Sequence, residues 1–244
     1  MMYDIHTHIL PNTDDGASSA ADALQMLRGA AMGGTKGIVC TPHCCIPNHP
    51  DNLYDSLLQN RFDRLRELCA GASIPLQLYL GQEIFLTGPV PALLAEGKLI
   101  TVNRSRYLLC EFAPGEHADL AVRKLQRLTA DGYIPVVAHP ERYRFLAEDI
   151  RMADRMKAAG ALLQPDACSL TGELGPMAAE LAGALLRRGA ADCIASDAHS
   201  PYSRTADLSE AYELICNLFS SDYAKLLFCE NPRRIIEDLP ILTT

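Results

Sequence analysis

The sequence predicts an α/β protein whose parallel strands form a seven-stranded (βα) TIM-like barrel, complete or missing part of its wall. Three observations predict this fold. Short β-rich runs alternate along the chain with segments of helical periodicity, the pattern of parallel strands joined by crossover helices. Several of these runs are almost continuously apolar, as expected for strands covered on both faces. The length of 244 residues is ordinary for one such domain, so we expect a single domain over residues 1–244.

The seven predicted strands are short and evenly distributed, with no repeat or linker between them. They lie at residues 3–8, 37–41, 77–83, 107–112, 134–138, 161–164 and 192–196. Helical patterns separate the strands. The first helix is capped by Ser18 or Ser19 and stopped by Gly33 and Gly34. The second begins at Asp51 and carries a stripe of leucines. Further helices are predicted at 119–130, 150–159, 176–188 and 205–219.

Composition excludes several classes of partner. The net charge of −8 argues against nucleic acid and against an anionic membrane surface, because both require clustered Lys and Arg. No apolar run is long enough to span a bilayer, and the first residues lack the pattern of a signal peptide. The nine cysteines form no C-x2-C pair, which argues against a structural zinc site. We expect a soluble cytoplasmic protein with reduced thiols and no membrane insertion.

Polar side chains gather where the predicted strands end. They are His6, His8, Asp14, Asp15, His43, Glu83, Glu111, His139, Asp197 and His199. The carboxyl ends of barrel strands open onto one face, where active sites lie. These groups are therefore expected to converge, although they are far apart in the sequence.

The spacing of His6 and His8 indicates a cation site. Alternate residues of a strand point to the same side, so both imidazoles face one way and can share a divalent ion. Asp197 and His199 repeat this spacing. The predicted ligands are too many for one tetrahedral zinc ion and fit two or three cations bridged by carboxylates. Cations about 3.5–4 Å apart activate water and favour in-line displacement at phosphorus.

Each residue alone has a simpler interpretation. A single histidine at a strand end is more often a hydrogen-bonded structural residue than a ligand, and Glu83 or Glu111 alone would serve as an ion-pair partner. Five of the seven histidines fall at these ends, however, and gathering charges there is costly without a cation. Taken together, the residues favour the metal interpretation. His49 and His117 lie in polar loops and are not predicted as ligands.

Two arginines are candidate phosphate ligands. Arg142 follows His139 by three residues, and Arg204 follows His199 by five. A guanidinium at the mouth of a barrel binds phosphate through two parallel hydrogen bonds. Spacing leaves open whether Arg142 binds phosphate or faces solvent, and for Arg204 it favours a solvated or helix-capping role.

Seven motifs, in order, resemble those of the polymerase and histidinol phosphatase (PHP) superfamily. They are DIHTHILPNTDDG, TPH, GQEIF, CEF, AHPERY, ASDAH and ENPRRII. DDG, H-x-E-R-Y and ENPR narrow the resemblance to its bacterial protein-tyrosine phosphatases, encoded with capsule and exopolysaccharide genes. The resemblance extends from Met2 to about Ile236.

The resemblance implies a distorted seven-stranded barrel with two or three divalent ions, manganese first and iron or zinc as alternatives. It assigns His6, His8, Glu83 and Asp197 to one ion. Glu83 would bridge to a second, completed by Glu111 and His139, and a third would be held by Asp15, His43 and His199. Arg142 and Arg204 would bind the phosphate, and Asp14 is not expected to be a ligand.

The implied reaction is hydrolysis of phosphotyrosine in a protein, such as a tyrosine autokinase of polysaccharide export. A coordinated water or His43 would protonate the leaving phenolate. The thiol-dependent route is excluded, because no cysteine is followed six residues later by the arginine of a C-x5-R loop. Three alternatives stay open: a PHP phosphoesterase acting on a small phosphomonoester such as histidinol phosphate, an amidohydrolase, and a non-enzymatic metal-binding scaffold. An amidohydrolase would need a lysine at a strand end, which no predicted strand provides.

Overall fold

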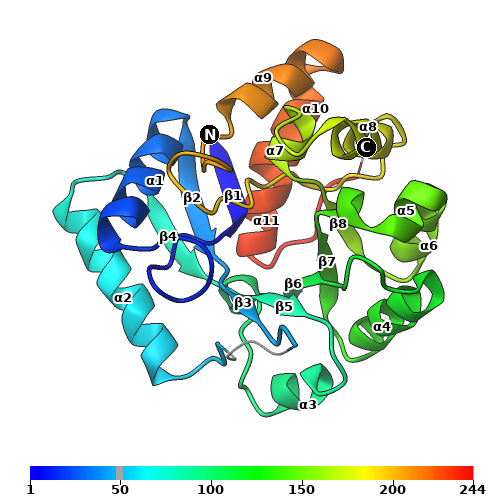
Figure 1. The fold of residues 1–244 in the computed structure, drawn as a ribbon, viewed down its shortest axis with the longest axis horizontal. Coiled ribbons are helices and arrows are strands. Elements are labelled where there is room, and N and C mark those ends of the chain that lie inside the picture. The colour runs from blue at the N-terminus through cyan, green and yellow to red at the C-terminus, as the bar shows by residue number, and fades with distance from the viewer. Residues whose placement is uncertain (48–51, 244) are drawn as a thin grey trace.

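The structure of the chain is a computed structural model that describes residues 1–47 and 52–243. His49 and the helix start predicted at Asp51 lie outside these residues. In the described part, strands occupy the centre and helices surround them (Figure 1).

The strands within the described residues are short and pair in parallel. They are β1 (Met2–Thr7), β2 (Thr35–Cys40), β3 (His43–Cys44), β4 (Gln77–Leu80), β5 (Glu83–Phe85), β6 (Tyr107–Glu111), β7 (Ile134–Ala138) and β8 (Leu162–Gln164). Hydrogen bonds join them in two parallel sheets, one in the order β1-β2-β4 and the other in the order β3-β5-β6-β7-β8. The prediction of an α/β fold with parallel strands is confirmed. A continuous seven-stranded sheet is not formed by these residues.

The predicted strand at residues 77–83 is divided between the two sheets, and the one predicted at 37–41 is followed by a separate short strand that belongs to the other sheet. β2 is followed after Thr41 and Pro42 by β3, and β4 is followed after Gly81 and Gln82 by β5. Single hydrogen bonds cross this interval, from Gly81 N to Cys40 O at 2.9 Å and from Glu83 N to Pro42 O at 3.2 Å. Pro42 has no N–H to donate, so the ladder is interrupted there. The hydrophobic pattern of the sequence continues across such an interruption and therefore does not reveal it.

The seventh predicted strand, residues 192–196, does not form a ladder with either neighbour. The amide of Asp192 donates to Leu163 O at 2.9 Å, whereas that of Ile194 donates to Leu227 O at 3.0 Å. The amide of Ser196 donates to a carboxylate oxygen of Asp4 at 3.1 Å. Isolated parallel bridges join Asp166 to Ala195 and Thr7 to Ala198. The segment therefore lies between β8 and β1 and forms hydrogen bonds with several different partners. Its apolar composition predicts burial but does not show whether a regular ladder forms.

The helices of the described residues account for all the predicted ones and add short turns. They are α1 (Ala20–Met32), α2 (Ser56–Gly71), α3 (Val90–Ala95), α4 (Ala118–Ala130), α5 (Arg144–Glu148), α6 (Met152–Ala158), α7 (Ala167–Leu170), α8 (Pro176–Arg187), α9 (Ser209–Leu218), α10 (Ser221–Lys225) and α11 (Asn231–Ile236), with turns η1 (Val102–Arg104), η2 (Pro140–Arg142) and η3 (Leu226–Glu230). No helix of residues 1–47 and 52–243 is long and apolar enough to cross a membrane.

Side-chain caps start α1 and α2, and a local side-chain hydrogen bond lies at the start of α9. Ser19 accepts from the amide of Asp22 at 3.2 Å, so the second of the two predicted caps starts α1. Asp55 accepts from Leu58 N at 2.9 Å, and α2 therefore begins at Ser56. The helix predicted from residue 205 begins at Ser209, whose amide is bound by the Asp207 carboxylate at 2.9 Å.

Apolar side chains fill both sides of the strands. Ile5, Val39, Leu109 and Val136, from four strands, meet in one cluster inside the fold and are fully buried. The outward faces pack against helices, as where Leu125 of α4 joins the cluster beneath β5, β6 and β7. The two-sided burial follows from the continuously apolar strands.

Strand β1 contains a register shift that positions the site. Asp4 pairs with Ile38 and Thr7 pairs with Cys40, so β1 has one more residue than β2 over this interval. Such a bulge changes the direction of the side chains beyond it. Ile5 belongs to the inner cluster, and the adjacent His6 also turns inward, toward Gln164 and Glu83.

Candidate metal centre

The predicted residues lie together at one end of the strands. Glu111 ends β6 and His139 follows β7, as predicted. His43 and Glu83 differ, because each begins a separate short strand and pairs with the other in register. The interruption at Pro42 thus places an imidazole directly beside a carboxylate.

A first group consists of His6, His8, Glu83 and Asp197, all buried. Nε2 of His6 lies 3.2 Å from Nε2 of His8, 3.1 Å from Oε2 of Glu83 and 3.3 Å from Oδ1 of Asp197. Nε2 of His8 lies 3.3 Å and 3.2 Å from the same two oxygens. Tetrahedral ligands at ~2.0–2.1 Å from one ion stand about 3.3 Å apart. The four residues therefore fit a single divalent ion.

A second group contains His43, Glu83 and Glu111. Nδ1 of His43 lies 2.9 Å from Oε2 of Glu83 and 3.2 Å from Oε1 of Glu111. Nε2 of His139 lies 2.8 Å from the other oxygen of Glu83 and 3.8 Å from Oε2 of Glu111. The carboxylate of Glu83 thus faces the first group and this one, which suits a bridging ligand.

A third group contains His8, Asp15, His43 and His199. Oδ1 of Asp15 lies 3.5 Å from Nε2 of His43 and 3.4 Å from Nε2 of His199. The side chain of Asp15 is 68% exposed, so this group opens to solvent. His117 directly precedes α4 and belongs to none of the groups found in the described residues.

The hydrogen-bonding state of these groups favours a cation. Among the described residues, Nδ1 of His43 lies 2.9 Å from Oε2 of Glu83 and 3.2 Å from Oε1 of Glu111, and these buried atoms do not form hydrogen bonds of regular geometry. Buried polar atoms are normally paired, and their grouping here matches a set of ligands. Burial would raise the pKa of Asp197, but His6 and His8 hold that pKa well below its ordinary value. His6 and His43 act in the same way on the pKa of Glu83.

Two supporting residues orient the histidines of the first group. Nδ1 of His6 lies 2.8 Å from Oε1 of Gln164, and Nδ1 of His8 lies 2.7 Å from Oδ2 of Asp14. A ring that donates from Nδ1 leaves Nε2 for a cation. Asp14 therefore contacts His8 from the side opposite its Nε2 atom. Gln164 was not singled out in the sequence, where it reads as the end of an apolar strand.

Backbone geometry at the site is unusual. His139, Asp197 and Arg204 have φ values of 37°, 51° and 46°, in the left-handed region that residues other than glycine rarely adopt. Such residues concentrate at functional sites. Gly16 is required for a different reason, because a Cβ atom there would lie 1.9 Å from the carbonyl oxygen of His8. This close approach explains the glycine of the DDG motif.

Both candidate arginines reach the site. Nη2 of Arg142 lies 2.7 Å from Oδ2 of Asp197 and 2.5 Å from Oδ2 of Asp166. Arg204 also contacts Asp197 through Nη2, although spacing had favoured a solvated or capping role. Asp166, fully buried, was missed by sequence reasoning, as was Glu141, whose Oε1 accepts from the Asp166 amide at 2.9 Å. Burial and Asp197 raise the pKa of Asp166 despite Arg142.

A pocket of about 310 Å³ opens onto the three groups. Its lining is Asp15, His43, Ile46, Phe85, Glu111, Phe112, Pro114, His139, Arg142, Tyr143, Asp197, His199 and Arg204. Guanidinium and imidazole groups thus share the pocket with apolar side chains. None of these lining residues is a lysine, which the amidohydrolase alternative requires.

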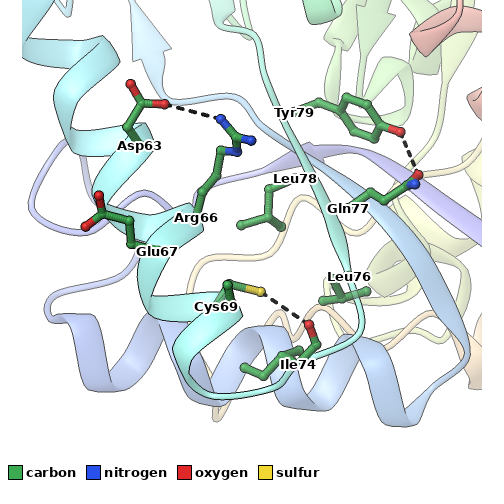
Figure 2. A pocket seen from close by; sticks show the side chains of 10 residues that line it. Asp63, Arg66, Glu67, Cys69, Ile74, Leu76, Gln77, Leu78 and Tyr79 are labelled. Carbon is green, nitrogen blue, oxygen red and sulfur yellow. Dashed lines mark hydrogen bonds and ion pairs between the residues drawn. The ribbon is translucent and has the colours of Figure 1, made fainter.

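A larger pocket, of about 910 Å³, lies elsewhere, between α2 and β4 (Figure 2). Its polar contacts include Arg66 with Asp63 at 3.5 Å and the hydroxyl of Tyr79 with Gln77 at 2.8 Å. Its lining contains no histidine and no member of the three groups that could hold a metal ion. Size alone therefore does not identify the functional site.

Comparison with known protein families shows to which family the chain belongs. Residues 2–237 match the family described as capsular polysaccharide synthesis, CpsB/CapC. The chain belongs to the CpsB/CapC family.

Relatives of this family match over almost the whole chain. Tyrosine-protein phosphatase YwqE of Bacillus subtilis (strain 168) is 33% identical over 244 residues, which cover 98% of this chain and 93% of the relative. Tyrosine-protein phosphatase CpsB of Streptococcus pneumoniae is 28% identical, with 97% and 99% covered. A crystal structure from work on YwqE and CpsB, described as unique metal-dependent tyrosine phosphatases, superposes with a TM-score of 0.93 at 32% identity, covering 100% of this chain and 97% of the other.

More distant structures share the fold alone. The phosphotriesterase from Mycobacterium tuberculosis superposes with a TM-score of 0.60 at 14% identity, covering 97% of this chain and 94% of the other.

Proposed function

We propose that this protein is a metal-dependent protein-tyrosine phosphatase. The observation that carries the proposal is the convergence of three metal-binding groups and two arginines on one pocket, in a chain whose relatives are named tyrosine-protein phosphatases. The substrate would be a tyrosine-phosphorylated protein, and membership of a capsular polysaccharide synthesis family supports a tyrosine autokinase of polysaccharide export.

We propose two or three divalent ions, with manganese first and iron or zinc as alternatives. His6, His8, Glu83 and Asp197 would hold one. Glu83, Glu111 and His139 would hold a second, with His43 within reach of it, and Asp15, His43 and His199 would hold the third. When bound, the ions would neutralise charge on the phosphoryl group and lower the pKa of water to near neutrality.

The side chains of the chain itself would bind and orient the phosphoryl group. Arg142 and Arg204 present Nη2 atoms on the same Asp197 oxygen, so both guanidinium groups stand at one edge of the metal centre. The buried carboxylate of Asp166 holds the same Nη2 atom of Arg142 in place through an ion pair. Donors held in place in this way stabilise charge that develops in the transition state. Proton donation by His43 stays a prediction, and a phenolate with a pKa near 10 leaves without a strong acid.

We also propose that the chain is one domain with a distorted barrel. Residues 192–198 bridge β8 and β1, and the short strands that follow β2 and β4 link the two sheets on the other side, which supports a ring of seven positions. A cytoplasmic location is supported by the buried thiols of Cys40, Cys110 and Cys193, which form no disulfide.

Phosphatase activity and its metal dependence can be tested together. Purified protein is assayed with a phosphotyrosine peptide and with histidinol phosphate, before and after chelation and after addition of manganese. We expect more than one equivalent of metal, preference for the peptide, loss of activity on chelation and its return with manganese. His8→Ala should abolish turnover, whereas Cys44→Ser should leave it largely intact. Activity that survives chelation but not Cys44→Ser would contradict the proposal, and preference for histidinol phosphate would favour the alternative substrate.

A further inference from the structure

We propose that Phe85, with Ile46 and Pro114, forms an apolar wall that selects phosphate esters carrying an aromatic ring over alkyl phosphates. This inference rests on the proposed function, because it assigns the part of the same pocket that would hold the tyrosine ring. It concerns residues that neither bind an ion nor contact the phosphate.

The strand order separates the pocket lining into two sides. Ile46 follows β3, Phe85 ends β5, and Phe112 and Pro114 follow β6. β3, β5 and β6 are neighbours in one sheet, so their apolar residues form a continuous wall. Arg142 follows β7, beyond β6 in the same sheet.

The cationic side is completed by residues that follow the segment between β8 and β1. His199 and Arg204 follow the segment that bridges to β1, and Arg204 meets Arg142 at Asp197. A phosphate bound at the arginines would therefore direct its ester group toward the apolar wall.

Strand geometry aims Phe85 at the metal centre. Residues two apart on a strand point to the same side, and Glu83 and Phe85 are the first and last residues of β5. Phe85 also pairs in register with Glu111, a member of the second group. The amide after it, that of Leu86, donates to Glu111 O at 2.9 Å, which fixes the backbone at this position.

Burial distinguishes the residues available to a substrate from those that support them. Phe112 and Tyr143 are each 1% exposed and pack edge to face with ring centroids 5.5 Å apart. They support the wall from behind. Ile46 and Phe85 are only partly buried, and Pro114 is exposed, so these three retain surface for a ligand.

The size of the pocket suits one aromatic side chain. Ligand pockets usually measure roughly 300–1,000 Å³, and at about 310 Å³ this one is near the lower limit. Phosphotyrosine places a ring between the phosphate and the peptide backbone, whereas phosphoserine has a single carbon there. A ring packed against Phe85 gains both burial and an aromatic contact.

The test measures binding of two probes that share a phosphonate group. Dissociation constants of phenylphosphonate and methylphosphonate are determined by calorimetry for the manganese-loaded protein, for Phe85→Ala and for Phe219→Ala. Phe219 is a matched control, because it is 37% exposed at the end of α9 and does not line this pocket. We expect the wild type and the control to prefer phenylphosphonate, and Phe85→Ala to lose about tenfold of that preference with methylphosphonate affinity unchanged.

Two results would contradict the proposed role of the apolar wall. One is an unchanged preference in Phe85→Ala, and the other is an equal loss of both probes, which would indicate general damage to the site. Phe85→Leu, which keeps apolar volume, should retain part of the preference. Failure of the proposed function is distinguishable, because a wild type that prefers phenylphosphonate but hydrolyses no phosphate ester would refute the activity and leave the wall intact.

Discussion

At the scale of single residues, the two histidines of β1 are held by different partners. His8 has the carboxylate of Asp14, and His6 has the neutral amide of Gln164. Gln164 in turn donates to Oδ1 of Asp166 at 3.1 Å, and Asp166 binds Arg142. A chain of largely buried contacts therefore links His6, which we propose as an ion ligand, to Arg142, which we propose as a phosphate ligand.

The role of Gln164 can be measured directly. Gln164→Ala should weaken binding of the ion held by His6 by about 10–100-fold, the usual effect of removing a partner that orients a ligand. Activity at saturating manganese should be largely restored. The measurement is a manganese titration of activity and of bound metal. Gln126→Ala, at an exposed position of α4, is the matched control and should behave as the wild type. Equal titration curves for both variants would refute the role.

Sequence reasoning singled out the histidines and carboxylates that the structure brings together, but it missed Gln164 and Asp166, which contact His6 and Arg142. Histidines and carboxylates at strand ends stand out because such groups are unusual beside apolar runs. Gln164 and Asp166 follow an apolar run as well, but an amide and a carboxylate before a helix read equally as a turn and a cap. Only their contacts in three dimensions separate these interpretations.

At the scale of elements, helix α4 illustrates how the apolar stripe secures the sheet beneath the site. Leu125 is fully buried and packs in the cluster that also contains Ile84 and Cys110 of the neighbouring strands. Leu120, on the same helix, is 38% exposed.

This contrast gives a stability prediction. Leu125→Ala should lower the free energy of unfolding by about 2–5 kcal/mol, because it removes buried methylene contacts and leaves a cavity. Leu120→Ala, the control, should change it by less than about 1 kcal/mol. Urea unfolding followed by circular dichroism provides both values. A similar loss in the two variants would mean that α4 does not pack as described.

Helix positions were predictable because an amphipathic period survives any tertiary context, and α4 and α8 begin within one residue of expectation. The pairing of the strands was less predictable. β3 has only two residues, His43 and Cys44, too few to produce a period. Residues 192–196 have the composition of a strand, but hydrogen bonds to Leu227 O and to Asp4 replace its ladder. The composition of a segment indicates that it is buried, but it does not indicate which groups accept the hydrogen bonds of its amides.

At the scale of the whole molecule, the metal centre collects carboxylates and imidazoles that the fold alone leaves partly unpaired. An ion that binds only the folded state stabilises it by mass action, by about 2.7 kcal/mol at a concentration 100 times its dissociation constant. Removing metal should therefore destabilise the entire protein.

Thermal unfolding tests this coupling. The metal-loaded protein should melt about 5–10 °C above the chelated protein, given a shift of about 2–4 °C per kcal/mol for a chain of this size. His8→Ala should show a much smaller difference between the two conditions. Identical melting temperatures for loaded and chelated wild type would argue against ions bound at these groups.

The contacts of β1 with a segment far away in the sequence have a consequence for the folding pathway. The amide of Asp197 donates to His6 O at 3.0 Å, and that of His8 donates to Ala198 O at 2.8 Å. Strand β1 therefore completes its surroundings with a segment that is very distant in the sequence, and such a long loop must close before its contacts contribute any free energy. We therefore expect the first group of the centre to assemble late in folding, after the local helices and neighbouring strands have formed.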